Sequence, residues 1–171
     1  MSDHNAPETP VPGATPPNVF EPRFDERREH PGFGVRRARV GRQAGSSRLG
    51  ASVWEIPPGQ AAYPYHAHLG EEELIVVLAG RPSLRTPQGW RDLAPGDLIA
   101  FARGEDGAHQ LTNRGPETVR ILACSTNGDP DIVIYPDAGK IGVGERRPDG
   151  SGLTAYFFGD QAVGYWDGVD A

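Results

Sequence analysis

Short apolar runs separated by glycine and proline constrain this chain more than any other feature. The 171 residues include 23 glycines and 17 prolines. Runs such as SVWEI, EELIVVLA, DLIAFA and TVRILAC are bounded by turn sequences such as Pro57-Pro58-Gly59 and Pro95-Gly96. Helical periodicity is hard to find. Many short strands with such turns predict an all-β fold, a small barrel or jelly roll of about eight strands.

Composition divides the chain into four parts. Residues 1–18 are rich in proline, threonine and alanine, and we expect a disordered tail there. Residues 19–46 form an N-terminal extension that could hold a short helical turn or an edge strand. Residues 47–126 are the expected barrel core. Residues 127–171 are a C-terminal extension whose many aromatic side chains should pack on the barrel or on a partner subunit.

The stretch HAHLGEEELIVVLAG, from His66 to Gly80, places two histidines and three glutamates before an apolar strand. Side chains two residues apart in a strand share a face, so His66 and His68 point the same way. A glutamate at the head of such a strand either stays in water at the rim or meets a cation. At most one or two of the three glutamates can face inward, and the others are expected to be solvated rim residues.

A third histidine, His109, opens a later strand after the loop RGEDGA. This loop could bring His109 beside the first pair. Imidazole nitrogens suit Zn, Cu, Fe and Ni, and a carboxylate widens the choice to Mn. The residues therefore indicate a metal site at the mouth of the barrel.

At this point the chain resembles the cupin superfamily. Its first motif reads Gly59, QAAYPY, His66-Ala67-His68, LGEE, Glu73, LIVVLA, Gly80, and its second reads Gly96, DLIAF, Ala102-Arg103-Gly104, EDGA, His109, QLT, Asn113. The chain departs from the usual pattern in a spacer one residue longer before His66, in Ala102 where proline is usual, and in a loop two residues longer before His109. The resemblance covers residues 47–126. Over its whole length the chain also resembles a group of uncharacterised single-domain bacterial cupins.

The resemblance implies a cupin double-stranded β-helix, with His66, His68, Glu73 and His109 binding one divalent metal ion, Fe, Mn, Ni or Zn. The six-residue gap to Gly80 selects Glu73, and Glu72 is the alternative if the spacer is shorter. Four protein ligands leave an octahedral metal two open positions for water or substrate. Phe101, just before the loop that carries His109, is expected to form a pocket wall. No catalytic residue can be named.

Two functions follow from this reading. The first is a metalloenzyme that acts on a small anionic or carbonyl-bearing molecule as a dioxygenase, isomerase, decarboxylase or lyase. The second is a non-catalytic cupin that binds a sugar or another small molecule, because a fold alone does not imply a reaction. A purely structural metal is a third reading, but structural zinc sites are usually closed.

Charge and composition exclude other classes. The formal net charge is -6, which disfavours nucleic acid as a partner. The basic residues between Arg23 and Arg42 alternate with acidic ones and are interpreted as a solvated surface segment. MSDHNAPETP lacks the apolar stretch of a signal peptide, and no run reaches the roughly 20 apolar residues of a membrane helix. We therefore expect a cytoplasmic protein.

Two further expectations concern single elements. Cys124 is the only cysteine and lies in an apolar run, so we expect a small buried hydrophobe rather than a reactive thiol. The strand around Leu74, Val76 and Leu78 is apolar on both faces and needs a cover. A second subunit would supply it and make the protein a homodimer, whereas the terminal extensions could cover the same surface within one chain.

Overall fold

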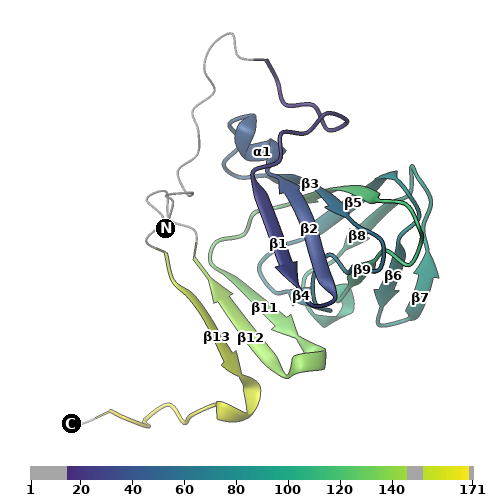
Figure 1. The fold of residues 1–171 in the computed structure, drawn as a ribbon. Helices are drawn as coiled ribbons and strands as arrows, with labels where there is room; N and C mark the ends of the chain where they lie inside the picture. The colour runs from purple at the N-terminus through teal and green to yellow at the C-terminus, as the bar shows by residue number, and fades with distance from the viewer. Residues whose placement is uncertain (1–14, 146–151, 170–171) are drawn as a thin grey trace.

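The computed structural model describes residues 15–145 and 152–169, and in them the chain is built almost entirely of antiparallel strands (Figure 1). The all-β prediction is confirmed. Residues 1–14, most of the predicted disordered tail and His4 with them, lie outside the described residues. No helix in the described part is long and apolar enough to cross a membrane.

The largest sheet has six strands in the order β1-β2-β3-β10-β5-β8. Its outermost pair, β1 and β2, is a hairpin of the N-terminal extension. β3 and β5 both pair with β10, which therefore lies at the centre of the sheet. The bounds are Glu26–His30 for β1, Phe33–Ala38 for β2, Gly50–Ile56 for β3, Val119–Ser125 for β10, Glu73–Ala79 for β5 and Leu98–Phe101 for β8.

Two smaller sheets contain the remaining strands of the described residues. One has the order β7-β6-β9, with β6 at Ser83–Thr86, β7 at Gly89–Asp92 and β9 at Gln110–Thr112. The other has the order β13-β12-β11-β4, with β4 at Ala67–His68, β11 at Asp131–Tyr135, β12 at Lys140–Gly144 and β13 at Thr154–Phe158. Within the described residues, helical structure is limited to α1, Val40–Gln43, and to single 3-10 turns at Glu105–Gly107, Pro136–Ala138 and Gly159–Gln161.

The core fills the space between the large sheet and the β7-β6-β9 sheet. Strand alternation places every second residue of β3, β5 and β10 inside. Their apolar side chains exclude water, which supplies most of the driving force for this fold. The buried members include Trp54, Ile56, Ile75, Val77, Leu84, Leu111, Val119 and Ile121.

Asn113, the asparagine of the second motif, stabilises the connection between strands. Asn113 is buried, and its side-chain amide donates to the carbonyl oxygens of Ile56 and Glu117 at 2.8 and 2.7 Å. Its Oδ1 accepts the N–H of Gly115 at 3.0 Å. Asn113 therefore closes the turn between β9 and β10 and ties it to β3.

The N-terminal extension covers the outer face of the large sheet. A second apolar cluster, with Ala38, Val40 and Val53 at its centre, includes Val19 and Phe24 from the extension and Leu78 and Leu122 from the sheet. The expected edge strand and helical turn are both present, as the hairpin β1-β2 and as α1. Cover for the outer face at Leu78 thus comes from within the same chain.

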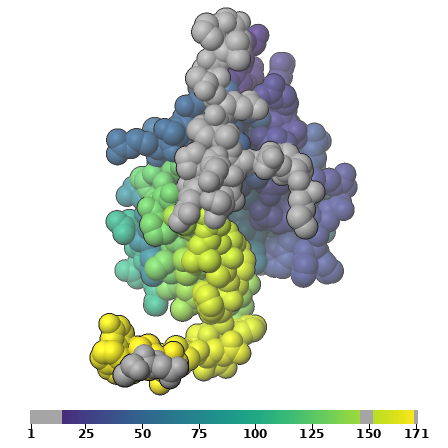
Figure 2. All heavy atoms as spheres, turned by 90° about the vertical axis from the view of Figure 1, so that its left-hand side faces the viewer, coloured from purple at the N-terminus to yellow at the C-terminus, as the bar shows by residue number. Residues whose placement is uncertain are grey.

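The C-terminal extension begins by pairing with the barrel and ends exposed. β11 pairs with β4, where Val133 lies opposite His68. Beyond β13 the chain reaches away from the rest of the molecule, at the bottom of Figure 2. Tyr165 and Trp166 are 85% and 74% exposed, and Tyr156, Phe157 and Phe158 on β13 are each more than half exposed.

Candidate metal centre

Backbone hydrogen bonds bring the two histidine-bearing segments together. The N–H of His66 donates to the carbonyl oxygen of His109 at 3.2 Å, and the N–H of His109 donates to that of His66 at 2.8 Å. His68 follows two residues later on β4, and Glu73 is the first residue of β5. The structure therefore gathers His66, His68, Glu73 and His109 at one end of the barrel.

The outer nitrogen of each imidazole is held by an oxygen atom. His66 Nδ1 lies 3.0 Å from the carbonyl oxygen of Pro64, and His109 Nδ1 lies 2.9 Å from that of Gly107. Carbonyl oxygens only accept, so both Nδ1 atoms carry the hydrogen. The lone pairs of the His66 and His109 Nε2 atoms are then left for a metal, which is the arrangement found around metal-ligating histidines.

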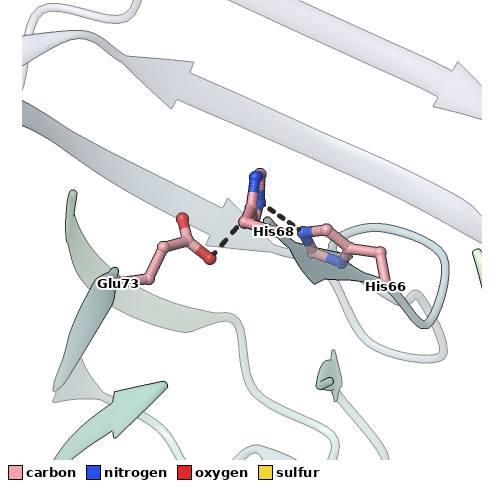
Figure 3. Close-up of side chains that lie close together, drawn as sticks. All are labelled: His66, His68 and Glu73. Atoms are coloured by element: carbon pink, nitrogen blue, oxygen red, sulfur yellow. Dashed lines mark hydrogen bonds and ion pairs between the residues drawn. The ribbon is translucent and has the colours of Figure 1, made fainter. Parts of the chain in front are cut away.

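The Nε2 atoms and the glutamate converge. His66 Nε2 and His68 Nε2 are 3.0 Å apart, and His68 Nε2 and Glu73 Oε2 are 3.7 Å apart (Figure 3). His109 Nε2 lies 3.1 Å from Glu73 Oε2, yet within the described residues it is a buried atom with no well-directed hydrogen bond. Lone pairs and a carboxylate repel one another unless a cation lies between them. Ligand atoms about 2.1 Å from a metal sit about 3.0–3.4 Å apart, close to the separations seen here.

The electrostatics of the four groups also suit a cation. Burial, followed by the neighbouring His109 and His68, lowers the pKa of His66 to about 3, so this imidazole is neutral at pH 7. Burial alone would raise the pKa of Glu73, but the close histidines, His109 first, outweigh it and hold this pKa at about 2. A carboxylate and a neutral imidazole are thus ready to bind a divalent ion.

His68 has a buried carboxylate partner, Asp131, which reasoning from the sequence missed. His68 Nδ1 lies 2.5 Å from Asp131 Oδ2, and Asp131 Oδ1 accepts the N–H of Gly70 at 3.0 Å. Burial alone would lower the pKa of His68, but the hydrogen bond that His68 donates to Asp131 and the charges of Glu73 and Asp131 raise it. Asp131 heads the apolar run DIVIY just as Glu73 heads ELIVV, and that shared pattern was the available signal.

The glutamates separate as the strand alternation requires. Glu72 is exposed, and its backbone N–H donates to Thr126 Oγ1 at 3.1 Å. Glu71 is only 3% exposed and lies with His68 and Asp131 in a second group of possible ligand atoms. The geometry therefore places Glu73, and not Glu72, beside the histidines.

Phe101 and Cys124 lie on either side of this centre. The Phe101 ring stacks on the His109 ring, with centroids 3.8 Å apart and planes 14° apart, and thus supports that imidazole. Phe101 lines a separate hollow next to Trp90 and Asp106, whereas Cys124 borders the cavity that contains the metal ligands. Cys124 was predicted to be a small buried hydrophobe, but it is only half-buried and borders the cavity.

A cavity of about 650 Å³ opens beside the ligands and is large enough for a small molecule. Its lining includes His66, His68, Glu73 and two tyrosines, Tyr63 and Tyr135. The Tyr63 ring meets the His66 ring edge-on at 4.7 Å, and the Tyr135 ring lies parallel to it at 6.2 Å. The site therefore combines side chains that could hold a metal ion with space for a small molecule.

A β-barrel with three imidazoles and one carboxylate at its mouth, a group that could hold a metal ion, is a jelly roll of the cupin type. Residues 52–125 match the family model described as the cupin domain, so this part of the chain is a cupin domain with the double-stranded β-helix fold. The matched segment runs from β3 to the end of β10 and contains all four predicted ligands. No curated protein matches the chain.

Solved structures extend the likeness beyond the barrel. A "putative sugar phosphate isomerase" from Acidithiobacillus ferrooxidans is 27% identical, with a TM-score of 0.71 over 80% of this chain and 86% of that chain. A sugar phosphate isomerase from a cupin superfamily, from Silicibacter pomeroyi, is 24% identical, with a TM-score of 0.73 over 85% and 94%. A predicted oxalate decarboxylase from Thermotoga maritima shares the fold at 22% identity and a TM-score of 0.51, over 58% of this chain and 89% of that chain.

Proposed function

We propose that this protein is a divalent-metal-dependent isomerase that acts on a small phosphorylated sugar. The observation that carries the proposal is the convergence of the His66 and His68 imidazoles and the Glu73 carboxylate on a cavity of about 650 Å³. The reaction class is suggested by the "putative sugar phosphate isomerase" from Acidithiobacillus ferrooxidans, which aligns with 80% of this chain.

The residues around the cavity would have two roles in such a site, metal binding and hydrogen bonding to the substrate. His66, His68, His109 and Glu73 would hold the metal, which when bound supplies a Lewis acid for a substrate carbonyl or hydroxyl oxygen. Burial and the charge of Glu73 raise the pKa of Tyr63 well above 10, and burial first, then Tyr156, raises the pKa of Tyr135 to about 12. Both phenols stay protonated at neutral pH, can donate hydrogen bonds to sugar oxygens, and form an aromatic wall that excludes water.

The test is an isomerisation assay on aldose and ketose phosphates with protein loaded with Fe, Mn, Ni or Zn. We expect metal-dependent interconversion, with deuterium from D₂O entering the carbon next to the carbonyl. Glu73→Gln should abolish turnover and Glu72→Gln should leave it within about twofold, because Glu73, and not Glu72, lies beside the histidines. Metal-dependent binding of a sugar phosphate without turnover would contradict the proposed isomerase activity. It would support the alternative, a non-catalytic sugar-binding cupin.

We also propose that a second copy of the chain covers the exposed aromatic end, as a homodimer. Each aromatic side chain of β13 and of residues 159–169 leaves a large apolar area in water, and burying it is worth roughly 25 cal/mol per Å². Light scattering should give twice the chain mass of 18.4 kDa. Replacing Tyr165 and Trp166 with serine should shift the protein toward monomer, and a monomeric native protein would refute the proposal.

A further inference from the structure

The inner face of the large sheet is apolar in the barrel and charged at the edge formed by β1 and β2. Paired residues form a rank across five strands, and paired neighbours in an antiparallel sheet share a face. From β5 to β1 this rank reads Val77, Ile121, Trp54, Arg37 and Glu26. The barrel core therefore gives way to buried charge where β1 and β2 extend the sheet.

Two arginines on this face line the same cavity as the metal ligands. Arg28 of β1 and Arg37 of β2 border that cavity together with His66 and His68. The guanidinium carbons of Arg37 and Arg28 lie 4.7 and 5.7 Å from the centre of the Trp54 ring, within the range of cation–π attraction. The prediction that the basic segment is simply solvated surface is therefore wrong for Arg37, whose side chain is 29% exposed.

Among the described residues, the ion pairs around Arg37 join more cations than anions. The Glu26 carboxylate contacts Arg28 at 2.9 Å, Arg37 at 3.7 Å and Arg39. Arg39 also pairs with Asp25 at 3.3 Å, so three guanidinium groups share two carboxylates. Desolvation dominates the environment of Arg37 and lowers its pKa to about 10 despite Glu26. A cation enclosed in this way is stabilised by a further anion.

Unsatisfied donors lie between the arginines and the metal ligands. The Trp54 indole N–H and the Tyr63 hydroxyl are buried and have no hydrogen-bond partner within the described residues. The two rings meet edge-on at 5.8 Å, and Tyr63 in turn meets His66 at 4.7 Å. An unpaired buried donor is costly, and acceptor oxygens on a ligand would relieve that cost. The path from arginines to histidines is thus lined by groups that suit an oxygen-rich molecule.

We infer that Arg28 and Arg37 form a subsite for the phosphate group of the substrate, in the same cavity as the candidate metal ligands. The planar guanidinium fork matches phosphate oxygens and holds its charge at any physiological pH. The inference rests on the proposed function for its substrate class. It adds that the anion binds to the hairpin β1-β2, outside the matched cupin domain, and not to the metal.

The test is calorimetric titration of inorganic phosphate into the full chain, both metal-loaded and stripped with a chelator. We expect binding in both states, weakened roughly 10–100-fold by Arg28→Gln or by Arg37→Gln. The matched controls are Arg27→Gln and Arg36→Gln. Arg27 precedes Arg28 and Arg36 precedes Arg37 in the chain, so each control side chain points to the opposite face of its strand. They should change the affinity by less than about twofold. Arg28 is the more exposed of the two, so Arg28→Gln decides the matter if Arg37→Gln does not fold.

Three outcomes would overturn the subsite: no phosphate binding, phosphate binding that disappears with the metal, or binding that Arg28→Gln leaves unchanged. A parallel titration with glucose 6-phosphate and with glucose should show that the phosphorylated form binds more tightly by the factor that Arg28→Gln removes. Arginine-dependent phosphate binding in a protein without isomerase activity would refute the proposed reaction and leave the subsite standing. Metal-dependent isomerase activity that Arg28→Gln leaves unchanged would refute the subsite and leave the proposed reaction standing.

Discussion

Glu73→Gln and His109→Ala proteins should be purified without the divalent metal that the native protein retains. Each change removes one donor from a four-ligand set, and loss of a ligand should exceed the roughly 10–100-fold effect of losing an outer partner. Glu73 is the carboxylate beside both His68 and His109, so the amide also removes the negative charge that favours a cation there. Metal content per chain, measured by mass spectrometry on untagged protein, gives the answer.

The matched controls are Glu72→Gln and His30→Ala. Glu72 is the exposed neighbour of Glu73, and His30 is an exposed histidine at the end of β1. Both variants should hold as much metal as the native protein. Loss of metal in Glu72→Gln with retention in Glu73→Gln would show that the shorter motif spacing is correct and that the ligand assignment is wrong.

Asp131→Asn should weaken metal binding by roughly 10–100-fold without abolishing it. Asp131 accepts from His68 Nδ1 at 2.5 Å, which fixes the ring and makes its Nε2 a stronger base. The amide keeps the shape of the side chain but loses the charge, so His68 becomes a weaker ligand. Competition titration against a chelator of known affinity measures the change.

Asp137→Asn is the control on the same segment, since that carboxylate pairs with Arg85 and not with an imidazole. Its metal affinity should match that of the native protein. Equal affinity in the Asp131→Asn and native proteins would mean that His68 does not depend on its carboxylate partner for metal binding.

Much of the barrel could be predicted from local patterns. Alternation, turn residues and the spacing of His66, His68, Glu73 and His109 are all short-range signals, and the structure brings those four residues together. The sequence predicted that one or two of the three glutamates face inward. The burial of Glu71 beside His68 agrees with that prediction.

The remainder depends on contacts between distant segments. Asp131 reaches His68 only because β11 pairs with β4, across 63 residues of chain. Arg28 and Arg37 lie in strands whose inner and outer faces are both charged, so no apolar alternation distinguishes the two faces. Their place in the cavity follows from the pairing of β2 with β3, which the local sequence does not encode.

The central claim is that three imidazoles and one carboxylate bind one metal at the mouth of this barrel. X-ray absorption spectroscopy of the metal-loaded native protein tests it most directly, because imidazole rings give a distinctive multiple-scattering pattern. We expect a first shell of nitrogen and oxygen with three imidazoles, falling to two in His109→Ala protein loaded at high metal concentration. A first shell containing sulfur, or one with a single imidazole or none, would contradict the metal centre described above.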